Sequence, residues 1–232
     1  MDTPNLKLIA ITSFFIALGI ISFALFVGSN FQTDRMLKLE SDLKTMNARM
    51  LDLENMEALS TLSNDSCVYL EKQLIDMREQ LEDIASQAIA MEQDLKTNTE
   101  EYKSLKKNLM ATRMRYWILA ERMKDTCHSN MTTVLYFYAT KTKCEDCLRQ
   151  GIILEHLNSK LGNILMISPV DMDEDLYTIN IMKAVYNVTY APTMIFDREK
   201  VFRGLTSEDE ILSYLCEKYN NTLQLCPSSE AH

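Results

Sequence analysis

The chain has 232 residues, which leaves room for one or two domains and excludes a large multidomain enzyme. Its hydrophobic content of 47% and charged content of 25% are ordinary for a globular protein and exclude wholesale disorder. With 24 Lys and Arg against 33 Asp and Glu, the formal charge is −9, and no basic stripe is present to neutralise a phosphate backbone. We therefore expect no nucleic-acid partner.

The N-terminal segment is strongly apolar. Residues 8–27 carry no charge over 20 positions, and at about 1.5 Å per residue a helix of this length spans a hydrocarbon core of roughly 30 Å. The pattern predicts a transmembrane anchor over residues 1–30 that holds the chain in a lipid bilayer as a single-pass protein. A cleaved signal peptide is the alternative, but its apolar region is shorter, about 7 to 15 residues, and Val27-Gly28-Ser29 is a poor cleavage site.

A long helical segment follows. No Gly or Pro occurs from residue 29 to residue 150, which is typical of helix. From residue 67 onward, apolar side chains recur in alternating steps of three and four, as in the heptads of a coiled coil. This seam consists of Cys67, Leu70, Leu74, Met77, Leu81, Ile84, Ala88, Met91, Leu95, Tyr102, Leu105, Leu109, Tyr116, Leu119 and Met123. We expect residues 31–125 to form a helical coiled-coil stalk.

An earlier seam has the same spacing in a different heptad frame. It consists of Met36, Leu39, Leu43, Met46, Met50 and Leu53. The frames meet near residues 60–66, where polar residues can cap a new helix, so a stutter in one rod or a turn between two helices is expected there. Asn98 and Thr112 interrupt the later seam, and a buried Asn is a known way to fix the register of a coiled coil.

The seam favours a spacer and dimeriser over a ligand-binding helix, because burial alone explains apolar heptads. Two copies anchored in one membrane would pair in parallel, so we expect a parallel homodimer. Cys67 would then meet its own counterpart, which predicts an interchain disulfide; a buried free thiol is the alternative.

The C-terminal part of the chain has a different pattern. A β-branched and aromatic run over residues 133–139 predicts a buried strand. The elements expected after it are a helix that begins around Cys144 to Cys147, a strand at 164–167, a helix that ends near 186, a hairpin at 194–203 and a helix at 207–219. The order βαβαββα predicts an α/β domain with a central mixed sheet over residues 131–220, followed by a C-terminal tail over residues 221–232.

Four features of this domain together resemble the thioredoxin superfamily. They are the strand that ends at Phe137-Tyr138-Ala139, the Cys144/Cys147 pair at the start of a helix, the Ala191-Pro192-Thr193 turn before a strand, and Gly204 after the hairpin. The resemblance covers about residues 131–220. It implies a cis peptide bond at Pro192, beside the cysteine pair, and a substrate chain that docks on the backbone of Ala191.

The resemblance implies a redox function, and the chemistry of the residues supports it. A thiolate at a helix N-terminus faces unsatisfied N–H groups and the positive end of the helix dipole, so Cys144 is the expected nucleophile. It would attack a protein disulfide to give a mixed disulfide, which Cys147, one turn further on and better shielded, resolves. The cycle needs no metal and no organic cofactor, and its partners are protein thiols and disulfides.

The charges around the pair oppose one another. Glu145 and Asp146 place negative charge beside Cys144, which opposes the helix dipole. The opposing positive charges are Lys141, Lys143 and Arg149. The net effect on the pKa of the thiol stays open.

Two positions depart from the pattern of thioredoxins proper. Tyr136 stands where they carry a buried acid, so a dedicated proton acceptor for Cys147 is missing. Lys143, in place of an aromatic residue, directly precedes Cys144. These departures favour a specialised or slower enzyme over a general thioredoxin.

Two other interpretations of the cysteine pair are open. A metal site could draw on Cys127, His128 or His156, although structural zinc usually requires a second closely spaced cysteine pair, and none exists. The second interpretation is a redox-inert thioredoxin-like adaptor presented on the stalk, because fold alone does not confer activity.

Cys216 and Cys226 lie ten residues apart, a spacing that allows a structural disulfide and, with it, an oxidising compartment. The Asn-X-Ser/Thr sequons point the same way; they are at Asn64, Asn130, Asn187 and Asn220. The positive charges that flank the anchor lean toward the opposite orientation, but long domains cross membranes largely regardless of such charges. The sequence thus predicts a membrane-tethered thiol–disulfide oxidoreductase with its thioredoxin-like domain on the extracytoplasmic side.

Overall fold

The computed structural model describes residues 14, 16–19, 55, 66–94, 97–140, 142–220, 222–223 and 225–226. The chain divides into two compact units, Met1–Ala58 and Leu59–His232. In the first unit the described residues are helical and exposed. The earlier seam, from Met36 to Leu53, and almost all of the predicted break at residues 60–66 lie outside the described residues.

No helix among the residues that the structure describes is both long enough and apolar enough to cross a membrane. The two longest, α2 (Ser66–Gln93) and α3 (Glu100–Cys127), carry charged side chains along their length. This finding contradicts the predicted single-pass membrane protein with its transmembrane helix and extracytoplasmic domain. Residues 8–27, on which that prediction rested, lie outside the described residues except for Phe14 and residues 16–19.

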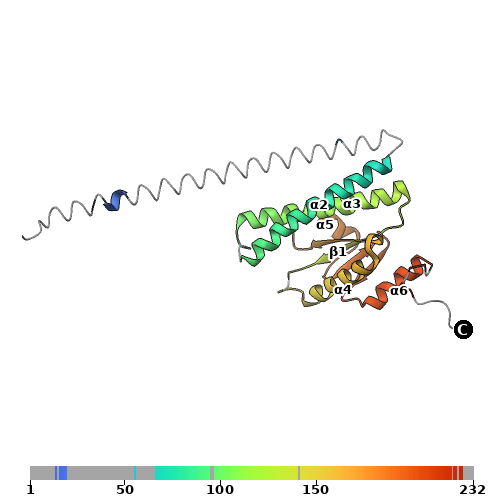
Figure 1. The fold of residues 1–232 in the computed structure, drawn as a ribbon. Coiled ribbons are helices and arrows are strands. Elements are labelled where there is room, and N and C mark those ends of the chain that lie inside the picture. The colour runs from blue at the N-terminus through green and yellow to red at the C-terminus, as the bar shows by residue number, and fades with distance from the viewer. Residues whose placement is uncertain are drawn as a thin grey trace, which may run out of the picture. The chain divides into compact units, whose positions relative to one another are not determined.

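Helices α2 and α3 pack against each other as an antiparallel hairpin (Figure 1). The Cys67–Cys127 disulfide joins the start of α2 to the end of α3. Thr99 caps α3, because its side chain accepts a hydrogen bond from the N–H of Tyr102 (3.2 Å). The second helix therefore starts afresh at this cap instead of continuing the first.

The hairpin corrects the prediction of one continuous seam from residue 67 to residue 123. Asn98, expected to be buried and to fix the register of a coiled coil, is an exposed turn residue between the helices. Apolar side chains of α2 and α3 are buried, but against each other and against the sheet described below. A seam indicates which face of a helix is buried and does not identify what covers that face.

Cys67 is bonded to Cys127 of the same chain, with the Cα atoms 5.6 Å apart, and not to a second copy as predicted. The prediction assumed parallel rods, in which Cys67 meets its own counterpart. In an antiparallel hairpin, Cys67 meets the residue at the far end of the partner helix instead. The parallel homodimer itself stays a prediction, but the seam that suggested it is covered within the chain.

The rest of the chain folds around a mixed sheet. Its strands are β1 (Thr132–Tyr138), β2 (Leu165–Asp171), β3 (Thr193–Phe196) and β4 (Lys200–Arg203). The accompanying helices are α4 (Glu145–Leu161), the 3-10 helix η1 (Gly162–Ile164), α5 (Tyr177–Val185) and α6 (Glu208–Lys218). The strand order is β2-β1-β3-β4, with β1 parallel to β2 and the other neighbours antiparallel. The predicted order βαβαββα is confirmed, and this four-stranded mixed sheet with its helices fits a thioredoxin-like fold.

Helices cover both faces of the sheet. Leu135 and Phe137 of β1 share one core with side chains of α2, α3 and α5. Val134 and Tyr136 share a second core with side chains of α4 and α6. Because successive side chains of a strand point to opposite faces, the central strand is buried on both sides and has a continuous apolar sequence. Helix α3, predicted to belong to a stalk, thus packs against β1 and β2 as one wall of the domain.

One edge of the sheet brings together three loops. Parallel strands β1 and β2 end at Tyr138 and Asp171, which are partners in the register. Strand β3 runs antiparallel to β1 and starts at Thr193, opposite Phe137. The loop that leads to the cysteines, the acidic loop after β2 and the loop that ends at Pro192 therefore meet at this edge.

Candidate functional site

The two cysteines of the candidate site are joined at the start of α4. Cys144 is the N-cap residue, with φ −149° and ψ 95°, and its sulfur forms a disulfide with Cys147. The Cys147 N–H also donates a hydrogen bond to Cys144 Sγ (3.1 Å). The structure therefore places the first sulfur where the unpaired N–H groups of the helix point.

This position favours Cys144 as the anionic sulfur once the pair is reduced. The helix N-terminus carries a partial positive charge, and a hydrogen bond from an N–H group stabilises a thiolate more than a thiol. Exposure does not separate the two residues, because Cys144 is 8% exposed and Cys147 is 6% exposed. The helix cap, rather than the expected shielding of Cys147, is what distinguishes the two sulfurs.

The predicted docking residues lie beside this pair. The peptide bond between Ala191 and Pro192 is cis. Half-buried Ala191 packs against the small cluster formed by Cys144, Cys147 and Ala139. The other partly buried side chains of this cluster are Tyr138 and Met172.

Gly204 supports the turn that carries the cis peptide bond. Its N–H donates to the carbonyl of Pro192 (2.8 Å). Its φ of 82° lies in the left-handed region that favours glycine, which gives a physical reason for a glycine directly after β4.

Tyr136 contacts the helix that carries the cysteines. Its hydroxyl donates to the carbonyl oxygen of Cys147 (2.6 Å) and thereby ties β1 to the first turn of α4. Burial, and to a lesser degree the neighbouring Tyr138, raises the pKa of this hydroxyl well above its usual value, so it stays protonated. A protonated phenol cannot take a proton from Cys147 as a carboxylate would.

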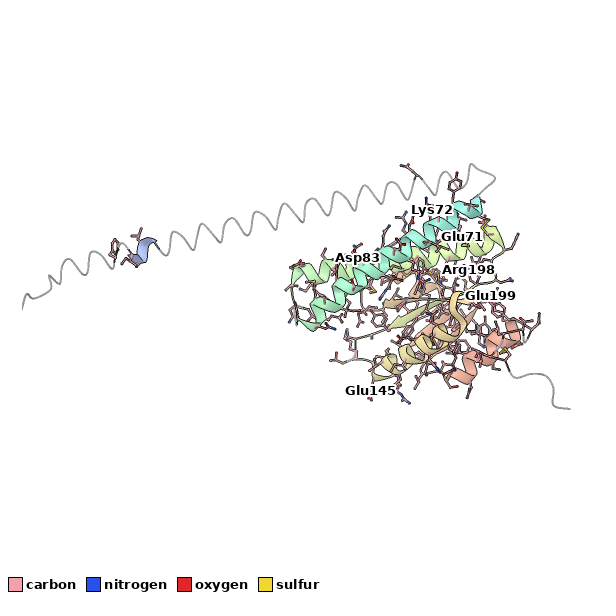
Figure 2. All side chains as sticks on the ribbon, viewed as in Figure 1. Glu71, Lys72, Asp83, Glu145, Arg198 and Glu199 are labelled. Carbon is pink, nitrogen blue, oxygen red and sulfur yellow. A yellow bond between two sulfur atoms is a disulfide. The ribbon has the colours of Figure 1, made fainter. Side chains whose placement is uncertain are left out.

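The charged residues next to the pair form ion pairs at the surface. Lys143 Nζ lies 2.8 Å from Asp173 Oδ2. The hydrogen bond and the attraction to Asp173 raise the pKa of Lys143 above its usual value. Asp146 pairs with Arg149 at 3.4 Å, while Glu145 is exposed at the tip of the helix (Figure 2). Pairing therefore partly neutralises the opposing charges that the sequence predicted around Cys144. Lys141 lies outside the described residues.

Sequence analysis missed a buried ion pair behind this edge. Asp171, at the end of β2, has a side chain only 1% exposed and lies 2.6 Å from Lys106 Nζ of α3. Burial lowers the pKa of Lys106, but hydrogen bonds and attraction to Asp171 and Glu174 outweigh burial, so the pKa is raised overall. The acidic run from Asp171 to Asp175 was the available signal, but nothing local points from it to a lysine 65 positions away.

The remaining cysteines and His156 have partners elsewhere in the fold. Cys216 of α6 is bonded to Cys226, which fastens the segment after α6. Cys127 is bonded to Cys67, and His156 Nδ1 lies 2.7 Å from Glu208 of α6. Among the described residues, no group of three or more His, Cys, Asp or Glu side chains is arranged to hold a metal ion.

No family model matches the chain, and no curated protein matches it. Part of the chain is similar to solved thioredoxins. Thioredoxin-2 of the malaria parasite's protein secretion machinery is 20% identical over 38% of this chain and 84% of its own, with a TM-score of 0.32. Chloroplastic thioredoxin z is 16% identical over 44% and 89%, with a TM-score of 0.35. The germline-specific thioredoxin Deadhead of Drosophila melanogaster is 21% identical over 42% and 89%, with a TM-score of 0.30.

Proposed function

We propose that the chain is a thiol–disulfide oxidoreductase that acts on protein thiols and disulfides through Cys144 and Cys147. The observation that carries this proposal is the disulfide at the N-terminus of α4, packed against Ala191. A disulfide placed only for stability would not need a helix N-terminus that favours a thiolate on one of its sulfurs.

The reaction is a two-electron exchange. In the reduced chain, the Cys144 thiolate attacks one sulfur of a substrate disulfide and forms a mixed disulfide, while the other substrate sulfur leaves as a thiolate and takes up a proton from solvent. Cys147 then loses its proton and attacks Cys144 Sγ, which releases the second substrate thiolate. The substrate disulfide is reduced to two thiols, and the Cys144–Cys147 disulfide forms. The reverse sequence oxidises a substrate dithiol.

Substrate docking is assigned to the turn at Ala191. The exposed part of this residue lies beside the cysteine cluster, so an extended peptide that runs along the turn would bring its own sulfur near Cys144. An exposed tyrosine, Tyr190, directly precedes the turn and adds apolar surface for that peptide.

The second step is proposed to be slow. Cys147 must lose a proton before it attacks, and its neighbour Tyr136 is a hydrogen-bond donor to the Cys147 carbonyl rather than a proton acceptor. The mixed disulfide should therefore persist longer than in an enzyme with a buried carboxylate at that position.

The test is to trap the mixed disulfide. Cys147→Ser removes the resolving thiol, so partner proteins should accumulate on Cys144 and be released by dithiothreitol on a non-reducing gel. The matched control, Cys144→Ser with Cys147→Ser, should trap nothing because both reactive sulfurs are gone. Absence of any trapped species, together with failure of the wild-type pair to exchange with a protein disulfide, would overturn the proposal in favour of a redox-inert adaptor.

A further inference from the structure

We propose that Lys106 of helix α3 is a positioning residue for the cysteine pair, acting through Asp171 and Asp173 on Lys143. This inference deepens the proposed function and rests on it. It makes the helical hairpin part of the redox unit, whereas the sequence suggested a separate stalk.

The first link joins α3 to the end of β2. Lys106 Nζ lies 2.6 Å from Asp171 Oδ2 and 3.2 Å from Glu174 Oε1. The lysine side chain is 20% exposed and the Asp171 side chain 1% exposed, so water screens this pair far less than a surface pair. Two carboxylates of the 171–174 loop are thus held by one ammonium group of the hairpin.

The second link fixes the loop itself. The other carboxylate oxygen of Asp171 accepts a hydrogen bond from the N–H of Asp173 (2.9 Å). The Met172 N–H donates to the carbonyl of Tyr138 (2.8 Å), and Lys183 Nζ donates to the carbonyl of Met172 (2.9 Å). The backbone on both sides of Met172 is therefore held where its side chain packs against the cysteine cluster.

The third link reaches the residue before the nucleophile. The fixed loop presents Asp173 to Lys143, whose Nζ lies 2.8 Å from Asp173 Oδ2. Lys143 and Cys144 belong to one turn, in which both of their N–H groups donate to the carbonyl of Thr140 (2.8 and 3.0 Å). A continuous series of contacts thus runs from the hairpin to the residue beside the reactive sulfur.

The consequence is electrostatic. While Asp173 holds the Lys143 ammonium, the two charges largely cancel at Cys144. When the loop is released, Lys143 is freed from its partner, and the potential at the sulfur becomes more positive. An anionic reagent should then react with the Cys144 thiolate faster relative to a neutral reagent.

The test compares iodoacetate with iodoacetamide. Each variant is reduced with limiting dithiothreitol so that the Cys144–Cys147 pair opens, and the label on Cys144 is measured by peptide mass spectrometry. The readout is the ratio of the iodoacetate rate constant to the iodoacetamide rate constant. This ratio reports local charge on Cys144 whether or not the pair exchanges with proteins, so failure of the proposed function and failure of the positioning role can be distinguished.

The main variant is Lys106→Met with Asp171→Leu. It removes both members of the buried pair and changes no net charge. The carboxylate left without its lysine is that of Glu174, which is 21% exposed and reaches water, so the fold should survive. We expect the ratio to rise about two- to fivefold, the size of a nearby screened charge. Asp173→Asn should raise it similarly, and combining the two changes should add nothing further. Lys106→Arg, which retains the ion pair, should keep the wild-type ratio.

The matched control is Glu100→Gln with Lys103→Met, which removes an exposed pair on the same helix (2.7 Å) and should not change the ratio. If the main variant does not fold by near-UV circular dichroism, Lys106→Met with Asp171→Asn replaces it under the same expectation. An unchanged or lower ratio in the folded pair variant would overturn the positioning role. An unchanged ratio in Asp173→Asn would also overturn it. The same holds if the effects of the pair variant and of Asp173→Asn are additive when the two are combined.

Discussion

The two ends of the sheet each bury an aspartate against a lysine of α3, yet the two clusters are organised differently. At the end away from the cysteines, Asp197 accepts hydrogen bonds from the N–H of Thr133 (3.1 Å) and from Lys218 (2.5 Å), and it pairs with Lys124 of α3. At the cysteine end, Asp171 pairs with Lys106 of α3 and the contacts continue outward through Asp173. Figure 2 shows this separation, with Glu145 at one end of the unit and Arg198 and Glu199 of the β3–β4 turn at the other.

The far cluster joins α3 to the β3–β4 turn, and Arg198 of that turn pairs with the exposed Asp125 of α3 (2.7 Å). Arg198 also pairs with Glu121 of α3 (2.9 Å), and Glu121 in turn accepts a hydrogen bond from the Thr133 hydroxyl. The ion pairs of the far cluster therefore connect α3, the β3–β4 turn and α6, which is the arrangement expected of a cluster that holds these helices to the sheet. At the cysteine end, the contacts instead continue from Asp171 through Asp173 to Lys143, the residue before Cys144. From this comparison we expect the far end to stabilise the fold and the cysteine end to support the proposed site.

The largest expected effect is on the far end. Asp197→Ala leaves Lys124, Lys218 and a backbone N–H without their carboxylate, so we expect a loss of about 3–5 kcal/mol in the free energy of unfolding. Denaturant titration of the oxidised protein measures this loss. Asp197→Asn, which tolerates the positive φ of 51° at this position, should cost less. A loss below about 1 kcal/mol in Asp197→Ala would show that this cluster is not structural.

The Cys216–Cys226 disulfide should have the next largest effect. Replacing both residues with Ser opens a loop of 10 residues, for which the chain-entropy model gives a loss of about 2–3 kcal/mol. Thermal unfolding measures it, and the reactivity of Cys144 toward iodoacetamide serves as the control. If the double substitution also changes the reactivity of Cys144, the division between a structural end and a functional end would not hold.

Tyr136→Phe should have a smaller effect on stability and a visible effect on the site. It removes the buried hydrogen bond to the Cys147 carbonyl, which is worth about 1 kcal/mol, and it loosens the first turn of α4, so exchange should slow. Stopped-flow exchange and denaturant titration measure the two quantities. Tyr214→Phe is the matched control, because its ring packs against Phe196 and Phe202 in the same core as Tyr136. Equal effects of both substitutions would assign Tyr136 to packing alone.

The smallest effect is the pH dependence of the contact between α4 and α6. Hydrogen bonds from Lys160 and His156 lower the pKa of Glu208 below its usual value of 4.5. A carboxyl whose pKa is lower in the folded state stabilises the fold above about pH 4.5, and this contribution is lost as the pH falls through the lowered pKa. The pair is partly exposed, so the contribution should be below about 1 kcal/mol.

The comparison for this pH effect is between wild type and Glu208→Gln. Their unfolding free energies should differ above about pH 4.5 and converge as the pH falls through the lowered pKa of Glu208. A difference that persists in acid would assign the effect to packing of the side chain rather than to its charge.

The parts of the structure that the sequence predicted are those set by local pattern. The apolar run of β1 predicted a strand that is buried on both faces. The position of the cysteine pair at the start of a helix could likewise be predicted from the residues that follow it. The partners of the hairpin could not be predicted in the same way. Asn98 occurs in a heptad pattern and gave no sign of a turn, and the pairing of Cys67 with Cys127 depends on that turn. The contact of Lys106 with Asp171 depends on how α3 crosses the sheet, which no local spacing specifies.

The central claim is that one of the three disulfides is reactive and that the other two are structural. The direct measurement is to equilibrate the intact chain in mixtures of reduced and oxidised dithiothreitol and to map the alkylation of all six cysteines by mass spectrometry. The account predicts that Cys144 and Cys147 open and close reversibly while the other two disulfides stay closed. It is contradicted if this pair stays closed, or if all three disulfides open together.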